Sequence, residues 1–247
     1  PQYPDEHSYC IGQTDLPLSM LGHLQAVFLH EALSDKISAI YCSPLSRAVD
    51  TARHIAPALP HLTVSELSER NLGSWDGLSF DEIRQKWPVI YEARGRNPEY
   101  PIPGAETPLE SGTRFSQAIS RILHSSDGNI AIVAHTDVIS SYLWMLHPEI
   151  SERQKFQLPC GSYYHLRIDT RGNAALSDSH YILPHPDLND ELCQMLRDSV
   201  DLPQHVQAHS DAVTELACRL CDILKLHGYL FDQQLIRSGA LLHDIAR

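Results

Sequence analysis

The sequence predicts an α/β fold over residues 1–183, in which a mostly parallel sheet lies between helices in three layers, followed by a small all-α segment. Short apolar strands alternate with amphipathic helices of about 10–15 residues up to that point, which is typical of β-α-β crossovers. Beyond residue 183 only helical patterns follow. The chain has 247 residues, enough for one large or two small domains. We expect a first domain over 1–183, a linker and first helix over 184–203, and a helical segment over 204–247.

Each element of the first domain has a local signal. Ser19 is a helix cap before apolar residues at helical spacing, and Pro44 fits the first turn of the second helix. Pro88 predicts a break within the third helix. Helices are predicted over 20–33, 45–59, 80–93, 109–124 and 138–146, and strands over 37–41, 62–64 and 130–134. Residues 160–169 and 174–182 alternate like an antiparallel pair that turns at 170–173, and we expect this pair to close the edge of the sheet.

The sequence pattern of the chain changes after residue 183. The run Pro184-His185-Pro186 is typical of a stiff linker. A helix over 204–227 carries an apolar stripe that includes Val213, Leu216 and Leu220, and Gly228 is a plausible end for it. Asp232 is predicted to cap a last helix over 233–247.

Composition excludes several classes of function. Lys and Arg number 19 against 31 Asp and Glu, so the formal net charge is -12, which argues against a nucleic-acid or anionic-membrane partner. No apolar run approaches the ~20 residues that span a bilayer. The six cysteines lack the spacing of a disulfide scaffold. We therefore expect a cytoplasmic protein without membrane or nucleic-acid partners.

Arg47 is the first candidate site residue. It falls in the first turn of a helix directly after a strand, where free backbone N–H groups and the positive helix end favour an anion. Its guanidinium adds a planar fork that suits phosphate. Taken alone, such an arginine is more often a surface residue paired with an acid.

His135 and Glu69 are the second and third candidates. His135 comes at the carboxyl end of the strand predicted to be most buried, where α/β sheets present their chemistry. Glu69 follows another strand and leads into the loop Gly73-Ser-Trp-Asp-Gly77. A core histidine bonded to a carbonyl and a solvated loop acid are the simpler interpretations of these two residues.

Four linked stretches occur in a characteristic order. They are Gly12-Gln-Thr-Asp-Leu-Pro-Leu-Ser19, Ser43-Pro-Leu-Ser-Arg47-Ala, Leu67-Ser-Glu69 with Gly73-Ser-Trp-Asp-Gly77, and Val133-Ala-His135. Together they resemble the histidine phosphatase superfamily, which includes phosphoglycerate mutase and α-ribazole phosphatase. The resemblance covers residues 1–183 and implies the phosphoglycerate mutase-like fold.

The resemblance also implies roles for individual residues. Arg47 would clamp a phosphoryl group, with Gln13, Thr14 and Thr136 as further phosphate-binding residues. Glu69 would be the proton donor and His135 would hydrogen-bond the phosphoryl oxygens. The substrate would be a small phosphorylated metabolite, and no cofactor would be needed.

One element of the family pattern is missing from the sequence. The family opens with an Arg-His-Gly run whose histidine is the nucleophile, and the 247 residues contain no such run. It would belong immediately upstream of Pro1, so we expect an internal fragment that is inactive as given. The stretch Tyr9-Cys10-Ile11-Gly12-Gln13-Thr14-Asp15 departs from many members of the family and looks closer to the α-ribazole phosphatase variant.

A second constellation lies in the helical segment. His209 precedes Val213 by four residues and Leu216 by seven, so we expect it to point inward with the apolar stripe. His243 follows the small residues Gly239-Ala240 on the last helix, with Asp244 beside it. For either histidine alone, a buried imidazole bonded to a neighbour is the more common finding.

His209-Ser-Asp-Ala-Val213 and Leu241-Leu-His243-Asp244 resemble the HD domain of metal-dependent phosphohydrolases. That resemblance implies a divalent metal held by His209, His243 and Asp244. The last Asp of the HD pattern would lie past Arg247, which would leave the metal site incomplete.

The leading hypothesis is therefore a phosphoric monoester hydrolase that acts through a phosphohistidine, with an appended HD hydrolase module. A phosphate-ligand sensor or regulatory pseudoenzyme that binds through Arg47 and His135 is an alternative, and a phosphoglycerate-type mutase is another. The sequence gives neither a substrate nor an oligomeric state. We expect Arg47, Glu69 and His135 to line one cleft.

Overall fold

The computed structural model describes residues 2–3, 8–126, 128–168, 174–181, 189–200, 202–227 and 232–245. A parallel three-stranded sheet lies at its centre, in the order β3-β2-β5, formed by β2 (Ala39–Cys42), β3 (His61–Thr63) and β5 (Ile130–Val133). In its register Cys42 lies opposite Val133 and Thr63. The carboxyl ends of the three strands therefore meet at one edge of the sheet.

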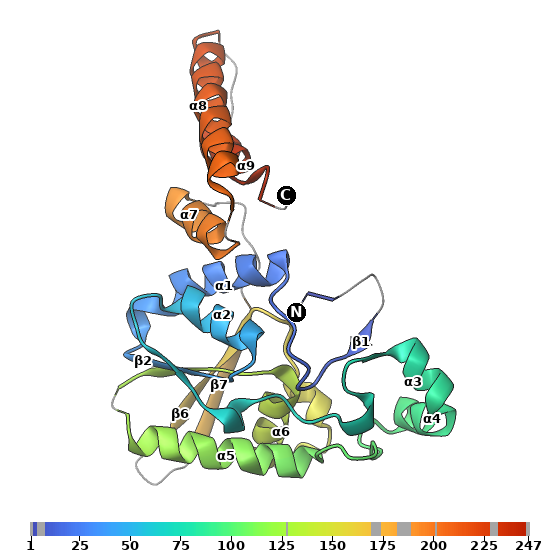
Figure 1. The fold of residues 1–247 in the computed structure, drawn as a ribbon. Helices are drawn as coiled ribbons and strands as arrows, with labels where there is room; N and C mark the ends of the chain where they lie inside the picture. The colour runs from blue at the N-terminus through green and yellow to red at the C-terminus, as the bar shows by residue number, and fades with distance from the viewer. Residues whose placement is uncertain are drawn as a thin grey trace.

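Helices cover both faces of this sheet, as predicted (Figure 1). One face carries α1 (Met20–Leu33) and α2 (Ser46–Ile55), and the other carries α5 (Pro108–His124) and α6 (Thr136–Leu146). The first of these helices begins where expected, because the Ser19 side chain accepts a hydrogen bond from the Gly22 amide. Short 3-10 turns link the elements over Ser34–Lys36, Ser65–Leu67, Gly73–Trp75 and Arg153–Phe156.

Two apolar clusters fill the space between the layers. The buried residues on the α1 and α2 side are Leu29, Ile40, Cys42, Ala52, Ile55 and Ala56. Those on the α5 and α6 side are Leu67, Phe115, Ala118, Ile119, Ile122, Val138, Tyr142, Leu143 and Phe156. The sheet is thus fixed from both faces, and the edge where its strands end stays available for polar side chains.

The predicted ends of α2 need correction. Pro44 lies before the helix and not in its first turn, since the helix begins at Ser46 with Leu45 as its cap residue. The helix ends at Ile55, four residues earlier than predicted, close before Pro57, which has no amide hydrogen to continue the pattern.

The antiparallel pair is formed by β6 (Ser162–Ile168) and β7 (Ala174–Tyr181), whereas the predicted turn at 170–173 lies outside the described residues. The expectation that this pair closes the edge of the parallel sheet is wrong for the described strands, since the pair forms a sheet of its own. Side chains of Leu166, Ile168 and Leu176 pack against the α5 and α6 cluster instead. The pair therefore attaches through apolar contact and not through a hydrogen-bond ladder with β5.

A small lateral unit was only partly predicted. The two-residue strands β1 (Tyr9–Cys10) and β4 (Leu78–Ser79) form an antiparallel pair that is too short for any periodic signal. The predicted break at Pro88 is confirmed, because α3 (Phe80–Lys86) ends before it and α4 (Pro88–Arg96) begins with it.

Beyond β7 the described residues form the helices α7 (Asp190–Ser199), α8 (Gln204–Leu226) and α9 (Gln233–Leu242). The domain boundary at 183 and the Pro184-His185-Pro186 linker lie outside the described residues, as does Gly228. The last helix ends at Leu242, well before the predicted end, because the chain leaves the helix in a turn at 243–245. Asp232 caps this helix as predicted, accepting from the Leu235 amide.

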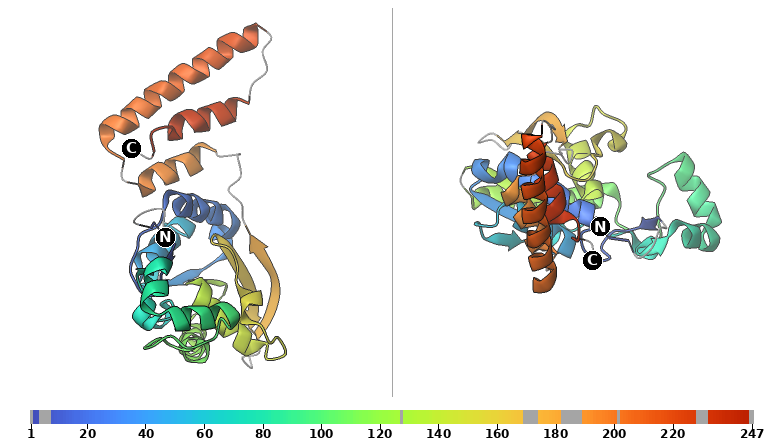
Figure 2. Two further views of the ribbon diagram at one scale, coloured as in Figure 1. Left: turned by 90° about the vertical axis from the view of Figure 1, so that its right-hand side faces the viewer. Right: turned by 90° about the horizontal axis from the view of Figure 1, so that it is seen from above.

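The helical segment docks on the first domain through α7, which lies against α1 (Figure 2). Val27 and Phe28 of α1 form a buried cluster with Leu196 of α7, and Leu242 and Ile245 pack against it. Arg197, which is buried, also ties α7 to α8 through Asp211 at 2.8 Å. Among the described residues, no helix is both long and apolar enough to cross a membrane.

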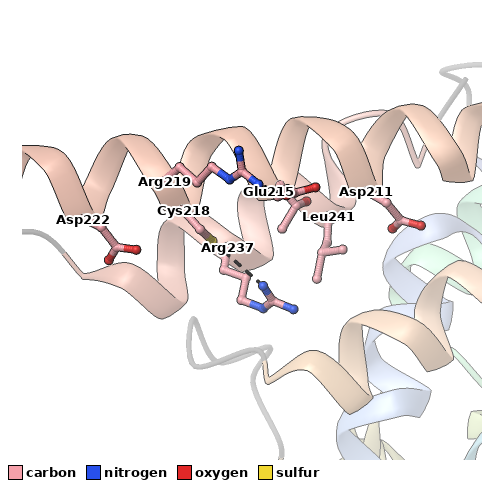
Figure 3. A pocket seen from close by; sticks show the side chains of 8 residues that line it. Asp211, Glu215, Cys218, Arg219, Asp222, Arg237 and Leu241 are labelled. Carbon is pink, nitrogen blue, oxygen red and sulfur yellow. Dashed lines mark hydrogen bonds and ion pairs between the residues drawn. The ribbon is translucent and has the colours of Figure 1, made fainter.

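The apolar stripe predicted for α8 is only partly buried, since Val213 is half-buried but other members face outward. Leu216 and Leu220 are 64% and 54% exposed, whereas Ser210, Thr214 and Cys221 are buried. The reason is that α9 packs on the side of α8 that carries Thr214 and Cys218, where a polar groove runs between the two helices (Figure 3). Arg237 of α9 reaches into this groove beside the Cys218 thiol.

The docking of α7 on α1 makes a prediction about stability. Leu196→Ala should lower the free energy of unfolding by ~2–5 kcal/mol, because it leaves a cavity in the buried cluster. Leu216→Ala is the matched control, since it has the same change in helix propensity at an exposed site and should cost within ~0.5 kcal/mol. Urea unfolding, followed by circular dichroism and by amide exchange in α7–α9, measures both. Equal losses in the two variants would contradict the docking.

Candidate active site

Arg47 lies in the first turn of α2 with its side chain buried. Its Nη2 donates to the Gly12 carbonyl at 2.7 Å, and its Nη1 donates to the Thr14 carbonyl at 2.9 Å. The start of the helix is held by Asp15, whose Oδ1 accepts from the Ser46 amide and hydroxyl, both at 2.8 Å. Burial lowers the pKa of the Arg47 guanidinium and the nearby Glu69 carboxyl opposes that shift, but an arginine stays charged in proteins.

Glu69 is buried and sits on the amino-terminal end of α6. Its Oε1 accepts from the amides of Arg70 at 2.7 Å and Val138 at 2.9 Å, and its Oε2 accepts from the Asp137 amide at 3.1 Å. These bonds favour the charged carboxylate, yet burial and the negative charge of Asp137 outweigh them and raise the pKa of Glu69 to about 7. A carboxyl with this pKa can donate a proton near neutral pH.

His135 is the cap residue of α6, two residues after the end of β5. Its ring is buried, and its Nε2 has no hydrogen-bond partner among the described residues. Burial lowers the pKa of His135 to about 3, helped by the positive charges of Arg47 and Arg114. The imidazole is therefore neutral at pH 7, with a polar atom available to a ligand.

The three candidates gather at the carboxyl edge of the sheet. Arg47 follows β2 and His135 follows β5, which are neighbouring strands. Glu69 reaches the same place through the α6 amides next to His135. The Gln13 side chain joins the groups further, since its Nε2 donates to the Glu69 carbonyl at 2.9 Å. The structure thus brings three distant stretches together, and the catalytic roles of these residues stay predictions.

The other predicted phosphate-binding residues are placed differently. The Thr14 hydroxyl donates to Asp76 at 2.8 Å, and the side-chain amide of Gln13 donates to the Glu69 carbonyl. Both side chains therefore hold the loop that carries them. Thr136 is exposed at the first position of α6.

A buried network behind Glu69 was not predicted. Arg70 donates its Nε to Asp137 at 2.7 Å, and Arg153 pairs with the other oxygen of the same carboxylate. Arg153 also reaches Glu99 at 3.0 Å and the Ser140 hydroxyl at 2.8 Å. This network fixes the first turn of α6 and so fixes the amides that hold Glu69.

A second ion pair, which was also not predicted, holds the segment just before Glu69. Arg114 of α5 pairs with Glu106 through two nitrogens, both at 2.9 Å, and donates to the carbonyls of Glu66 at 2.7 Å and Ser68 at 3.1 Å. Of the residues in these two networks, only Ser68 lies inside one of the four stretches that carry the resemblance, and it takes part through its backbone carbonyl. The others come from separate segments and carry no local signal.

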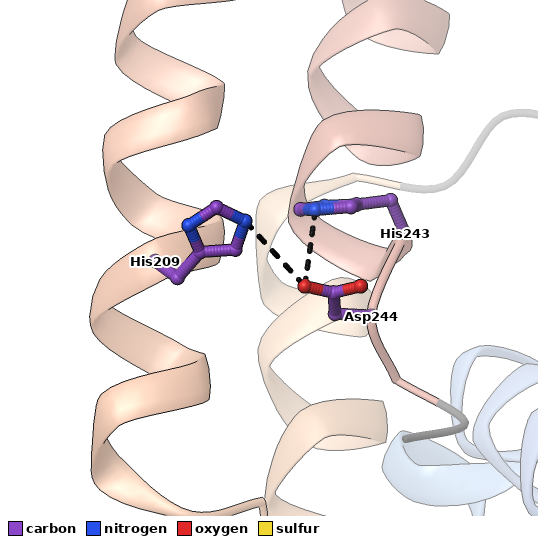
Figure 4. A group of neighbouring side chains, drawn as sticks. All are labelled: His209, His243 and Asp244. Atoms are coloured by element: carbon purple, nitrogen blue, oxygen red, sulfur yellow. Dashed lines mark ion pairs between the residues drawn. The ribbon is translucent and has the colours of Figure 1, made fainter.

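The predicted metal ligands also meet (Figure 4). Asp244 Oδ2 lies 3.5 Å from His209 Nε2 and 3.2 Å from His243 Nε2, and the candidate ligand atoms all lie within 4.8 Å of one another. His243 Nδ1 lies 2.7 Å from the Ala240 carbonyl, which places the proton on Nδ1 and leaves the Nε2 lone pair for a metal. Two imidazoles and a carboxylate suit a divalent transition metal.

The surroundings of this cluster differ from the prediction. His209 does not point inward, because its side chain is 57% exposed beside an open pocket that Pro203, His205 and Val206 also line. His243 lies just past the end of α9 and not within it. Asp244 is the buried member of the group.

The raised pKa of Glu69 predicts a pH dependence of stability. The protonated carboxyl favours the fold, so its contribution is fully present below pH 4.5 and is lost as pH rises through about 7. In Glu69→Gln the side chain is neutral at every pH. As pH rises from 4.5 to about 7, the free energy of unfolding of the wild type should therefore fall relative to that of Glu69→Gln, by at most the slope that one bound proton gives. Urea titrations at a series of pH values measure the difference.

Glu66→Gln is the control for this measurement. Glu66 is exposed, and hydrogen bonds from Ser65 and the backbone lower its pKa, so its contribution changes below pH 4.5. A Glu69→Gln difference that stays flat between pH 4.5 and 7 would contradict the raised pKa.

Comparison with known proteins identifies the family of this chain. The model of the histidine phosphatase superfamily (branch 1) matches residues 2–178 and ends before α7. The chain is 35% identical over 152 residues to the phosphoglycerate mutase-like protein 4 of Arabidopsis thaliana, covering 58% of this chain and 66% of that protein, just under two thirds of its length. It is 26% identical over 171 residues to phosphoserine phosphatase 1 of Hydrogenobacter thermophilus, covering 67% and 81%.

A solved structure gives the same result for the fold. The α-ribazole phosphatase of Shigella flexneri superposes with a TM-score of 0.58 at 26% identity, covering 69% of this chain and 87% of that one. The edge of the sheet where Arg47, Glu69 and His135 meet lies within the matched residues. The chain belongs to the histidine phosphatase superfamily, branch 1.

Proposed function

We propose that this chain is part of a phosphoric monoester hydrolase that works through a phosphohistidine. The attacking histidine would come from an Arg-His-Gly run, which the 247 residues do not contain. The observation that supports the proposal most is the buried carboxyl of Glu69, with a pKa of about 7, held on α6 next to the neutral ring of His135. An acid for the leaving oxygen and a polar group for the phosphoryl oxygens then lie on one helix end.

Each residue has a distinct task in this reaction. Glu69 gives its proton to the departing oxygen, and the three amides that surround its carboxyl stabilise the negative charge left behind. Arg47 supplies a positive charge at the same edge of the sheet, which offsets the charge of the transferring phosphoryl group. His135 offers its Nε2 to a phosphoryl oxygen.

The substrate class that we propose is a small phosphorylated metabolite, with no cofactor in this domain. The relatives named above act on phosphoserine or α-ribazole phosphate according to their names, or are mutase-like. A phosphoglycerate-type mutase would use the same three residues, so a product assay separates it from a phosphatase. The net charge of -12 and the six free thiols support a cytoplasmic protein without nucleic-acid or membrane partners.

The chain by itself offers a third possibility, which is binding without turnover. We propose that turnover needs the Arg-His-Gly run, and that the 247 residues alone bind a phosphate monoester without hydrolysing it. The complete reading frame from the source DNA shows whether an Arg-His-Gly run is encoded, and a hydrolysis assay of the 247 residues tests whether they turn over a phosphate monoester. If the triplet before Pro1 is different, a phosphate sensor or regulatory pseudoenzyme becomes the better proposal.

The proposed general acid gives a kinetic prediction. In the protein that carries the Arg-His-Gly run, Glu69→Gln should slow hydrolysis of an ester with a poor leaving group by ~10²–10⁴, the effect of one general acid. An ester whose leaving group needs no proton should be affected much less. Steady-state assays with both esters measure the effect, and Glu66→Gln is the control because its carboxylate is exposed. An unchanged rate with the poor leaving group would remove Glu69 from this role.

A second candidate function rests on the cluster of His209, His243 and Asp244. We propose an HD-type phosphohydrolase module in which these residues hold a divalent metal, and the Nδ1 contact of His243 to Ala240 supports that assignment. When bound, the metal would activate a water molecule for attack on phosphorus. The protein's own part is to keep both Nε2 atoms and the carboxylate facing one point.

The metal site predicts a binding result. Mn²⁺ or Zn²⁺ added to the metal-free chain should bind at one site, and His209→Ala should weaken that binding by more than the ~10–100-fold that loss of an outer partner costs. His227→Ala is the control, because His227 is an exposed histidine at the far end of the same helix. Isothermal titration calorimetry measures both variants. In the full reading frame, hydrolysis that a chelator abolishes would belong to this module, and chelator-resistant hydrolysis to the first domain. Equal affinity in both histidine variants would refute the site.

A further inference from the structure

Asp76 binds three consecutive amides of the loop that Arg47 contacts. Its Oδ1 accepts from the amides of Gly12 at 3.0 Å and Thr14 at 3.2 Å, and its Oδ2 accepts from the Gln13 amide at 2.7 Å. The Thr14 hydroxyl adds a fourth bond to Oδ1 at 2.8 Å. A single carboxylate from the turn after Trp75 thus determines the path of a loop more than sixty residues earlier in the chain.

The carbonyls of the same loop are what hold Arg47. The guanidinium donates to the oxygens of Gly12 and Thr14, the first and last residues of the loop that Asp76 holds by its amides. The Asp76 carboxylate therefore accepts hydrogen bonds from the amides of the loop, and the Arg47 guanidinium donates hydrogen bonds to its carbonyls. If the loop moved, the two carbonyls and the plane of the guanidinium would move with it.

Two glycines make this close approach possible. A Cβ on Gly12 would lie 2.7 Å from the Arg70 carbonyl and 3.0 Å from Asp76 Oδ2. Gly77, which follows Asp76, has a φ of +80°, and a Cβ there would lie 3.0 Å from Thr14 Oγ1. Its amide also donates to the Cys10 carbonyl at 2.9 Å. The loop and the turn are therefore packed backbone to backbone, and Asp76 is the charged group at their contact.

We propose that Asp76 is a positioning residue for the anion-binding site: by holding residues 12–14 it fixes the direction of the Arg47 guanidinium and, through Gln13, the backbone at Glu69. Asp76 need not touch the substrate for this role. The inference rests on the proposed function in one respect, namely that Arg47 binds the phosphoryl group.

Substitution of Asp76 by asparagine tests whether two acceptor oxygens are needed, and substitution by glutamate tests whether the length of the side chain matters. Asparagine keeps one acceptor oxygen but turns an NH₂ group towards backbone amides, so at least one of the four bonds is replaced by a contact between two donors. Glutamate keeps both oxygens on a longer arm and can restore part of the contact. Thr14→Val removes only the hydroxyl bond and leaves the three amide bonds in place.

The first measurement concerns the guanidinium itself and needs no ligand. In the wild type, ¹⁵N–¹H spectra should show separate, slowly exchanging Nη signals for Arg47, because its two Nη atoms donate to fixed carbonyls. In Asp76→Asn these signals should merge, and amide exchange at 12–14 should speed up by roughly tenfold or more. Asp81→Asn is the matched control, since Asp81 is an exposed carboxylate in the first turn of α3, five residues after Asp76. Unchanged Arg47 signals in Asp76→Asn would overturn the proposal.

The second measurement uses inorganic phosphate as the probe, titrated by ³¹P NMR or calorimetry. We expect Asp76→Asn to bind phosphate roughly tenfold more weakly than the wild type, Thr14→Val to lose less, and Asp76→Glu to recover part of the affinity. Amide protection in α5 and α6 shows whether each variant is folded, and Asp76→Glu and Thr14→Val keep the test valid if Asp76→Asn is not.

The two proposals fail in different ways. If Arg47→Ala binds phosphate as well as the wild type, the assignment of Arg47 to the phosphoryl group fails, while the Arg47 signals still decide whether Asp76 positions the guanidinium. If Arg47→Ala loses phosphate binding but Asp76→Asn keeps both the affinity and the separate Nη signals, the positioning role of Asp76 is refuted and the proposed function stands.

Discussion

The candidate site depends on the parallel pairing of β2 with β5. Their register places Cys42 opposite Val133, so the residues that follow both strands emerge side by side. Arg47 and His135 each lie within the first turn or cap of the helix that follows its strand. A shift of the register would separate these helix starts, and the apolar clusters on both faces of the sheet oppose such a shift.

The two acidic groups at the start of α6 are held by different kinds of contact. Glu69 is held on the start of α6 by amides, and Asp137 of the same turn is held by Arg70 and Arg153. Burial raises the pKa of Glu69 and lowers the pKa of His135. The two arginines lower the pKa of Asp137, and its negative charge adds to the effect of burial on Glu69. The site therefore contains a proton donor and a neutral imidazole next to a permanent positive charge, an arrangement suited to a phosphate ester.

The helical segment packs on α1 of the first domain. Its Val27 and Phe28 contact Leu196, while Leu242 and Ile245 flank the pair His243 and Asp244 in the chain and pack against the same cluster. The residues that bracket two of the proposed metal ligands thus pack against the same cluster through which Leu196 of α7 contacts the first domain. The position of the proposed metal site relative to that domain follows from this apolar contact.

Sequence alone determined the order of the main helices and of the parallel strands, the caps at Ser19 and Asp232 and the break at Pro88, because these depend on neighbours within a few residues. It also pointed to Arg47, Glu69 and His135 through motifs at the ends of strands. Only the tertiary structure decided which face of α8 is buried, that His209 is exposed, and that Asp76 binds the loop at 12–14. Those outcomes depend on contacts between residues far apart in the chain, for which local periodicity and spacing hold no information.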